Sequence, residues 1–303
     1  MLLTQVVWAV PKRKRDATIE SPRPSIAVLI PAHNESAGLV QTLDCIQPQL
    51  MSGDRILVVA DNCTDDTACL ARKAGAETVE RIDAQLAGKG YALDFGVRHL
   101  AHNPPGVVVI VDADCTVLPG ALDRLARMAA ATGLPVQALY LMKAPPGAGR
   151  FAKIAEFAWL VKNLVRPLGF LRLGLPCQLT GSGMALVWRL AGRARLATDN
   201  LVEDLQMGLD FARQGAAPRF CPEAVVESHF PVNRSGTESQ RKRWEHGHLA
   251  MILKEVPRLW LEGLGGGGRN ILALALDLCV PPIAMLVLLE IGRASSRERA
   301  CHR

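Results

Sequence analysis

The stretch VVVIVDADCTVLPG, residues 107–120, constrains the fold of this chain more than any other. A run of aliphatic residues ends at once in two carboxylates, Asp112 and Asp114, which are separated by one alanine. A run that is apolar at every position is typical of a strand covered on both faces, as in a parallel sheet between helices. Such sheets bind ligands at the carboxyl ends of their strands. The stretch therefore predicts an α/β protein with a polar site directly after this strand.

The preceding sequence repeats the same alternation of strand and helix. SIAVLIP (25–31) and DRILVVAD (54–61) are apolar runs, and each is followed by a segment with helical spacing of its apolar residues, at 35–50 and 65–75. A further segment, GKGYALDFGVRHL (88–100), precedes the opening stretch. Strands that alternate with helices of this length predict βαβ units in a mostly parallel sheet flanked by helices.

After Gly133 the alternation becomes less regular. We predict strands at VQALYLMK (136–143) and LTGSGMALVW (179–188). We predict helices in an amphipathic stretch at 151–175, in LVEDLQMGLDFARQG (201–215) and in the basic segment 239–256. The expected organisation is a membrane-proximal segment at 1–24, one catalytic domain at 25–262, and a glycine-rich linker with an apolar segment and a basic tail at 263–303.

The charge distribution argues against nucleic acid as a partner. The chain carries a formal net charge of +6, and residues 11–16 and 293–303 each contribute an excess of three positive charges. The middle of the chain is therefore neutral, whereas a nucleic-acid site needs a basic face on the folded domain. Basic ends suit a membrane surface better. The eight cysteines include no CxxC pair, so we expect reduced thiols in a cytosolic compartment.

Two segments predict contact with a membrane. Residues 271–289 are almost uniformly apolar and approach the roughly 20 residues that a spanning helix needs. Asp277 and the pair Pro281 and Pro282 interrupt them, so a kinked span, a re-entrant hairpin and a buried core helix all remain open. The first ten residues are too short to span and could form an interfacial anchor, with PKRKR (11–15) on the cytosolic side.

The two acids of the opening stretch suit a divalent metal ion. Residues two apart on a strand share a face, so Asp112 and Asp114 can converge on one Mg²⁺ or Mn²⁺ ion, with substrate phosphates as further ligands. A turn with a capping aspartate is the alternative. IPAHNE (30–35) and VADNCTDD (59–66) end the other strands on polar groups, which favours a site at this sheet edge. Lys89, between two glycines in a predicted loop, could approach a diphosphate.

Taken together, these segments resemble the nucleotide-diphospho-sugar glycosyltransferases of family 2, which have the GT-A fold. The resemblance runs from about residue 25 to 260. DAD (112–114) resembles the DxD motif of that family, VEDLQMG (202–208) its ED element, and QRKRW (240–244) its QxxRW motif. TGSGMALVWR (180–189) is similar to the glycine-containing acceptor loop between them.

The resemblance implies roles for particular residues. Asp204 would be the catalytic base, Asp61 would contact the nucleotide base, and Asp112 and Asp114 would hold the sugar diphosphate and its metal ion. The other implied donor-binding residues are Pro31, Glu35 and Lys89, and those implied for the acceptor and the diphosphate are Gly181, Gly183, Gln240, Arg243 and Trp244. One departure concerns Asp61: many relatives carry Asp-Asp-Gly-Ser where this chain has DNCT (61–64), so the identity of the nucleotide is less secure.

Local patterns bear on these implied roles. Glu203 and Asp204 are neighbours on a predicted helix, and we expect only one of them to face the cleft. Asn200 as N-cap with Glu203 three residues later resembles a capping box, which would leave Asp204 for chemistry; alternatively, both acids complement the helix N-terminus. Gln240, Arg243 and Trp244 share one helical face, where a guanidinium can grip phosphate and an indole can face a sugar. His246 and His248 are expected to be structural or to face the acceptor.

The implied function is an inverting transfer of a sugar from a nucleotide-diphospho-sugar, with a UDP-sugar favoured, to a polysaccharide or lipid acceptor. The expected location is the cell inner membrane, with membrane lipids as partners and the catalytic domain on the cytoplasmic side. The amphipathic stretch 151–175 could lie in the membrane interface or pack on the sheet. The alternative function is a non-catalytic nucleotide-sugar sensor or scaffold subunit. A dehydrogenase is disfavoured because the first strand is not followed by GxGxxG.

Overall fold

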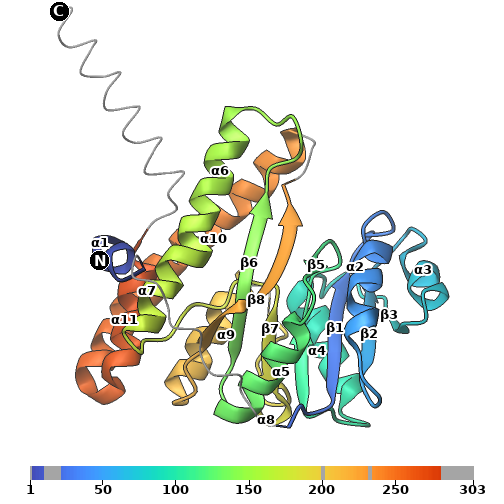
Figure 1. The fold of residues 1–303 in the computed structure, drawn as a ribbon, viewed down its shortest axis with the longest axis horizontal. Coiled ribbons are helices and arrows are strands. Elements are labelled where there is room, and N and C mark those ends of the chain that lie inside the picture. The colour runs from blue at the N-terminus through green and yellow to red at the C-terminus, as the bar shows by residue number, and fades with distance from the viewer. Residues whose placement is uncertain (1, 10–21, 199–201, 231–233, 281–303) are drawn as a thin grey trace, which may run out of the picture.

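The computed structural model describes residues 2–9, 22–198, 202–230 and 234–280, without the side chains of residues 2, 151, 234–245 and 267. The described residues form one eight-stranded sheet in the order β3-β2-β1-β4-β7-β6-β8-β5 (Figure 1). Helices cover both of its faces. The α/β architecture predicted from the sequence is confirmed.

The amino-terminal half of the sheet is parallel, as predicted. Strand β1 pairs with β2 on one side and with β4 on the other, and β2 pairs with β3. The elements of this half are β1 (Ile26–Ala32), α2 (Leu39–Ile46), the short 3-10 helix η1 (Gln47–Gln49), β2 (Arg55–Asp61), α3 (Thr67–Lys73), β3 (Glu77–Arg81), α4 (Lys89–Leu100) and β4 (Val107–Ile110).

The all-apolar strands are explained by burial on both faces. In β1, Ile26 and Val28 pack in a core with Leu39 and Leu43 of α2, whereas Leu29 packs in a second core with Leu93 and its neighbours on α4. All residues from Ile26 to Ile30 are fully buried. Successive residues of the strand point to opposite faces of the sheet. Because helices cover both faces, the residues on either face are apolar.

The remaining half of the sheet is mixed rather than parallel. Strand β7 runs antiparallel to both β4 and β6, β8 runs parallel to β6, and β5 is antiparallel to β8. The elements are β5 (Thr116–Val117), α5 (Ala121–Thr132), β6 (Val136–Lys143), β7 (Met184–Val187), α8 (Trp188–Ala191) and β8 (Arg219–His229). Only residues 184–187 of the predicted strand 179–188 form β7.

Further helices lie against this mixed half (Figure 1). They are α1 (Leu2–Ala9), α6 (Arg150–Leu160), the π-helix η2 (Val161–Val165), α7 (Arg166–Arg172), α9 (Glu203–Arg213), α10 (Arg234–Glu262), the π-helix η3 (Gly263–Gly267) and α11 (Gly268–Leu278). Arg213 on α9 pairs with Glu255 at 2.7 Å and with Glu262 at 2.9 Å on α10. These ion pairs fix the helix that begins with Glu203 and Asp204.

A buried polar cluster joins α1, α7 and α11. Asp277 Oδ1 accepts hydrogen bonds from Gln5 Nε2 at 2.6 Å and from Arg166 at 2.8 Å. The acid that interrupts the apolar segment is therefore paired inside the protein. In the described part of the chain, none of the helices has the length and apolarity to cross a membrane. Residues 271–278 form part of α11 in the core, and 281–289 lie outside the described residues, so a membrane role for 271–289 stays a prediction.

The amphipathic stretch 151–175 packs on the sheet while exposing part of its surface. Trp159 donates a hydrogen bond from Nε1 to the carbonyl of Tyr140 at 3.1 Å, and its ring stands edge-on to those of Tyr140 and Phe230. Phe157 on the same helix is 62% exposed. The prediction that the stretch 151–175 packs on the sheet is therefore correct for its inner face. Its outer face remains available for another contact.

The close approach of α1 to α7 gives a first testable prediction. A Cβ atom at Gly169 would stand 2.1 Å from the carbonyl oxygen of Gln5, so Gly169→Ala must push α1 away from α7. Such overpacking costs about 1–3 kcal/mol of unfolding free energy, measurable by urea denaturation. Gly265→Ala is the matched control, because a Cβ atom there meets nothing within 4 Å. Equal stability of the two variants would contradict this packing.

Candidate functional site

The predicted acid pair lies in a turn beyond the end of β4. Strand β4 ends at Ile110, and the amide of Cys115 donates to the carbonyl of Asp112 at 3.2 Å, which closes a turn. The assumption that both acids lie on the strand is therefore wrong. Their side chains still share one side of the chain, because Ala113 between them is buried whereas Asp112 is half-buried and Asp114 exposed.

Residues that the sequence analysis did not single out position this turn. Ser182 Oγ accepts a hydrogen bond from the amide of Asp112 at 3.1 Å, and Ser228 Oγ donates to Asp114 Oδ2 at 3.2 Å. The buried Gln137 in turn donates to the carbonyl of Ser182 at 2.8 Å and accepts from the amide of Thr180 at 2.9 Å. One polar side chain in an otherwise apolar strand, VQALYLMK, is the signal that could have identified Gln137.

Lys89 is the cation at the centre of the site. It is the first residue of α4, after Gly88 with φ of 131°, so its predicted position within a loop is wrong. Its Nζ lies 2.5 Å from Asp112 Oδ1, donates to the carbonyl of Gly181 at 2.8 Å, and stands 3.9 Å from Glu203 Oε1. Burial disfavours the charge of Lys89, but the nearby carboxylates outweigh burial and raise its pKa.

Two neighbouring acids at the start of α9 both approach Lys89. The helix begins at Glu203 after Val202, so the capping box predicted from Asn200 is wrong, and Asn200 itself lies outside the described residues. Glu203 faces Lys89 directly. Asp204 Oδ2 lies only 3.3 Å from the position that a Cβ atom on Gly181 would occupy. The expectation that only one of the two acids faces the cleft is therefore also wrong.

The buried acids hold their protons more tightly than free carboxylates do. Burial raises the pKa of Glu203 to about 7, against a pull downward from the charge of Lys89. Burial likewise raises the pKa of Asp204, and the Lys89 charge again opposes the shift. A carboxylate whose pKa approaches neutrality is suited to accept a proton at physiological pH. The start of α9 therefore offers a candidate general base.

The two predicted loop glycines have different surroundings. Gly181, with φ of +88°, lies between Lys89 and Asp204, where a side chain would fill the site. Gly183, with φ of +70°, faces the sheet, and a Cβ atom there would stand 2.7 Å from Ala138 Cβ and 2.9 Å from Val226. The structure thus brings Gly181 into the site. At Gly183, close packing against β6 and β8 explains why the residue is a glycine.

The predicted donor-binding residues of the first two strands lie at the same sheet edge. Pro31 is in β1 opposite Val59 of β2. Burial raises the pKa of Glu35, and the charges of Asp114 and Asp112 raise it further, so Glu35 lies within electrostatic range of the acid pair.

Asp61, at the end of β2, is buried in an ion pair. Its Oδ1 accepts from Arg81 NH1 at 2.6 Å, and the guanidinium of Arg81 lies 5.5 Å from the ring centroid of Tyr91. Arg81 is a further residue that the sequence analysis missed, because β3 was not predicted.

The predicted QxxRW residues fall partly outside the described structure. Gln240, Arg243 and Trp244 belong to α10, but their side chains lie outside the described part, so their approach to the site stays a prediction. Among the two histidines that follow, His246 is exposed and His248 lines an internal cavity. His248 Nε2 lies 3.3 Å from the carbonyl oxygen of Val280.

The acid pair provides the oxygen atoms that a hard divalent ion prefers. Among the described residues there is no group of three possible metal ligands. A magnesium- or manganese-type site needs only one or two protein carboxylates when phosphate and water oxygens complete the shell. Asp112 is paired with the ammonium of Lys89, and Asp114 accepts hydrogen bonds only from the hydroxyl of Ser228 and the thiol of Cys115 among the described residues, so both carboxylates keep oxygen lone pairs for a further cation.

Comparisons with known proteins point to one family. A family model described as glycosyltransferase like family 2 matches residues 22–247. The 4,4'-diaponeurosporenoate glycosyltransferase of Staphylococcus aureus (strain MRSA252) is 36% identical over 97 residues, which are 31% of this chain and 25% of that protein. The match therefore spans about a quarter of the length of this relative.

Solved glycosyltransferase structures share the fold. A mannosyltransferase from Pyrobaculum calidifontis, in complex with GDP-Man and Mn²⁺, has a TM-score of 0.64 at 19% identity over 97% of this chain and 86% of its own. Glucosyl-3-phosphoglycerate synthase from Mycobacterium tuberculosis, in complex with Mn²⁺, UDP and glucosyl-3-phosphoglycerate, has a TM-score of 0.50 at 22% identity over 80% of this chain and 85% of its own. These likenesses support the GT-A type of fold. Because the family model covers most of the chain, the protein belongs to glycosyltransferase family 2.

Proposed function

We propose that this protein transfers a sugar from a nucleotide-diphospho-sugar to an acceptor hydroxyl group, with inversion at the anomeric carbon. The observation that carries the proposal is the arrangement around Lys89, whose ammonium contacts Asp112 of the acid pair and the carbonyl of Gly181, beside which Asp204 lies. A candidate base and a candidate site for the leaving diphosphate are thus adjacent. Direct displacement needs both groups in one site, with the acceptor and its base facing the anomeric carbon from the side opposite to the leaving diphosphate.

The acid pair and Lys89 are the groups that would receive the donor diphosphate. Asp112 and Asp114 would hold a Mg²⁺ or Mn²⁺ ion, which when bound supplies positive charge to the leaving diphosphate. The ammonium of Lys89 is half-buried, and the nearby carboxylates raise its pKa and keep it charged, so it can donate to a phosphate oxygen once the donor separates it from Asp112. The structural neighbours were solved with Mn²⁺ and with GDP-Man or UDP, which supports this class of donor. Among the nucleotide-diphospho-sugars, we propose a UDP-sugar as the donor.

Asp204 is the proposed base. Its carboxylate is buried beside the glycine loop, and it would accept the proton of the attacking acceptor group. A single displacement with one base inverts the anomeric configuration, so an α-linked donor should yield a β-linked product. Glu203, which faces Lys89 directly, is proposed to balance the charge of that lysine instead.

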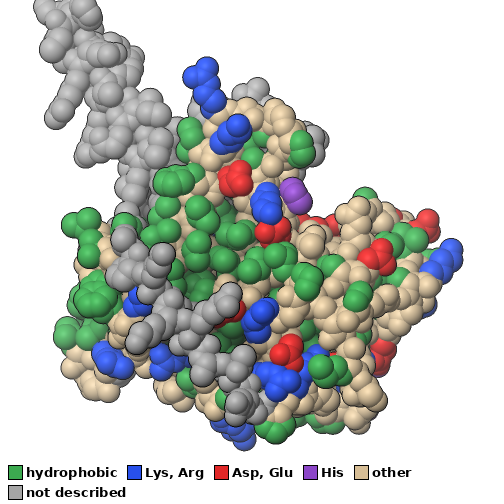
Figure 2. Space-filling model, viewed as in Figure 1, with side chains coloured by type: hydrophobic (Ala, Val, Ile, Leu, Met, Phe, Trp, Pro, Cys, Tyr) green, Lys and Arg blue, Asp and Glu red, His purple; other side chains and the backbone are tan. Residues whose placement is uncertain are grey.

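The acceptor is proposed to be a lipid or a saccharide at the cytoplasmic face of a membrane. Apolar side chains gather on the face formed by α6, α7 and α1, with lysine and arginine side chains around them (Figure 2). Exposed members of this surface include Leu3 at 75%, Val7 at 57% and Phe157 at 62%. An apolar patch with a basic border fits the interface of an anionic membrane. Sedimentation with anionic vesicles tests this location.

The assignment of Asp204 predicts the effect of a conservative substitution. Asp204→Asn keeps the shape of the side chain but cannot accept the proton, so transfer should fall by about 10²–10⁴-fold while nucleotide binding stays nearly unchanged. Release of nucleotide from a panel of UDP- and GDP-sugars measures the reaction. Asp210→Asn, near the other end of the same helix, is the matched control, and it should retain activity within about tenfold. Lost nucleotide binding in Asp204→Asn, or a product of retained configuration, would contradict this role.

The acid pair predicts a requirement for a divalent ion. Chelation by EDTA should abolish transfer, and added Mn²⁺ or Mg²⁺ should restore it in the wild type but not in Asp112→Asn or Asp114→Asn. Direct Mn²⁺ binding, followed by electron paramagnetic resonance in the presence of UDP, gives a readout that does not depend on activity. Asp44→Asn on the exposed side of α2 is the control. Full Mn²⁺ binding by both site variants would show that the ion binds elsewhere.

The raised pKa of Glu203 predicts how stability depends on pH. The carboxyl has a pKa of about 7 in the folded protein against an ordinary value of 4.5, so the folded state keeps a proton that the unfolded chain releases. The free energy of unfolding therefore falls as the pH rises from about 4.5 to about 7. Glu203→Gln removes this titration, so its stability relative to wild type should rise by roughly 1–3 kcal/mol across that window and then level off. Urea denaturation in EDTA measures the free energy of unfolding of both proteins at each pH. If the difference between Glu203→Gln and wild type did not change with pH, the raised pKa of Glu203 would be refuted.

A further inference from the structure

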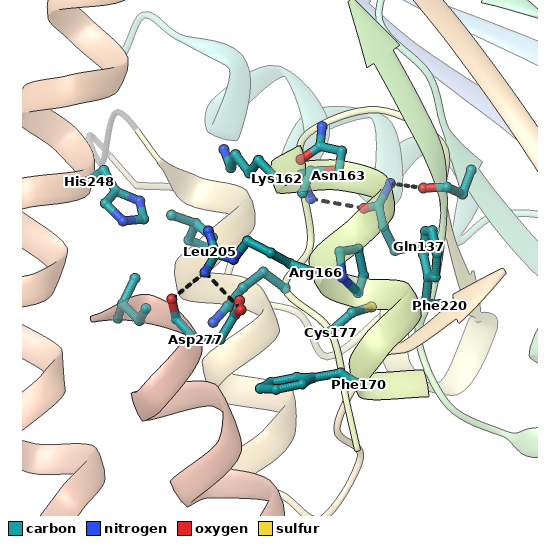
Figure 3. Close-up of a pocket in the computed structure, with 15 residues that line it drawn as sticks. Gln137, Lys162, Asn163, Arg166, Phe170, Cys177, Leu205, Phe220, His248 and Asp277 are labelled. Atoms are coloured by element: carbon teal, nitrogen blue, oxygen red, sulfur yellow. Dashed lines mark hydrogen bonds and ion pairs between the residues drawn. The ribbon is translucent and has the colours of Figure 1, made fainter. Parts of the chain in front are cut away.

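A narrow cavity lies behind the glycine loop of the site. It has a volume of about 30 Å³ and is enclosed by η2 and α7, by β6, by the start of α9 and by the end of α11 (Figure 3). Thr180, next to Gly181, and Leu205, next to Asp204, both line it. The cavity therefore adjoins the proposed base.

The π-helix η2 forms one wall of this cavity. Lys162 and Asn163, both in η2, point into it (Figure 3). Asn163 is anchored by a hydrogen bond from Nδ2 to the carbonyl of Tyr140 at 2.9 Å, and the ammonium of Lys162 lies 5.0 Å from the ring centroid of Trp159. A π-helical turn in the middle of a longer helix is energetically unfavourable and is found frequently at functional sites.

Lys162 contributes a positive charge that the described residues leave without an ion pair. Burial lowers the pKa of Lys162, and no carboxylate among the described side chains lies within ion-pair distance of it. The neighbouring Arg166, by contrast, is paired with Asp277 at 2.8 Å. Burial lowers the pKa of His248 to about 4, so this histidine is neutral at pH 7. The cavity therefore carries one cation without a direct ion-pair partner among the described residues, with the charges of Asp204 and Asp277 within electrostatic range of it. An anionic ligand could pair with it directly.

Polar atoms without partners surround that cation. Asn163 Oδ1, Gln178 Oε1 and Thr180 Oγ1 are buried and have no hydrogen-bond partner in the described structure. All three residues line the same cavity. A ligand for this set needs an anionic group for Lys162 and hydroxyl groups that donate to the two amide oxygens. Unmade hydrogen bonds at buried atoms carry a free-energy cost, so a ligand that makes them gains affinity.

We propose that this cavity is an acceptor subsite that takes a small end group carrying both hydroxyl groups and a carboxylate or phosphate. The proposal rests on the proposed function, because it places the acceptor beside Asp204. The charge of Lys162 lowers the pKa of Asp204, which puts the ammonium within electrostatic range of the proposed base. The cavity is narrow, so it admits an end group rather than a whole sugar, and the remainder of the acceptor extends away from it.

Direct binding to the full-length protein tests the subsite. D-glycerate, inorganic phosphate and glycerol are titrated calorimetrically in the presence of EDTA, so that no anion binds through a divalent ion. The wild type should bind D-glycerate or phosphate at least about tenfold more tightly than glycerol, because only the anions pair with Lys162. The two anions together tell whether the site prefers a carboxylate or a phosphate.

Matched variants separate this site from other anion sites. Lys162→Met should weaken anion binding by about tenfold or more, and Thr180→Val by a smaller factor, whereas Lys153→Met on the exposed side of α6 should change nothing. Lys162→Met should also unfold at the same or a higher urea concentration, because it removes an unpaired buried charge. Unchanged anion binding in Lys162→Met, or equal binding of glycerol and the anions by the wild type, would overturn the proposal.

The outcome is distinguishable from a failure of the proposed function. Hydrolysis of nucleotide-sugar by water needs the donor site and no acceptor subsite. A wild type that releases nucleotide but does not distinguish anions from glycerol keeps the transferase assignment and loses the subsite. A wild type that binds anions through Lys162 but releases no nucleotide from any UDP- or GDP-sugar keeps the subsite and loses the transferase assignment.

Discussion

The site depends on one half-buried ammonium that balances acids from two different parts of the chain. Lys89 at the start of α4 contacts Asp112 beyond β4 and stands near Glu203 and Asp204 at the start of α9. Without that charge, the carboxylates would repel one another at short range in a half-buried cleft. The same ammonium donates to the carbonyl of Gly181, so it also fixes the loop that separates the two groups of acids. Electrostatic balance therefore acts together with the apolar core that joins α4, β4 and α9.

Much of the amino-terminal half could be predicted because its signals are local. The apolar runs of β1, β2 and β4 are buried on both faces, so the sequence shows them without knowledge of their partners. The acids that follow these strands could also be predicted, because they come directly after the apolar runs. The predicted strand 136–143 matches β6 residue for residue, but its one polar residue, Gln137, was not recognised as the support of the glycine loop.

The remaining features depend on partners that are distant in sequence. Strand β8 was missed because Pro222 and Glu223 interrupt its apolar alternation, and its register against β6 shifts between Ala138 and Leu139. Glu203 was assigned to a capping box because a local pattern fitted, whereas the contact that determines its role is with Lys89, more than one hundred residues earlier. Lys162 gave no local signal, because a lysine in an amphipathic helix is ordinarily solvated.

The helices on the mixed half of the sheet connect the outer apolar surface with the site. The helix through α6, η2 and α7 exposes Phe157 on one side and presents Lys162 to the cavity on another, so a single element touches both the proposed membrane surface and the proposed acceptor subsite. The buried cluster of Gln5, Arg166 and Asp277 fixes α1 and α11 against this element. An acceptor held in a lipid surface would therefore reach Asp204 along η2.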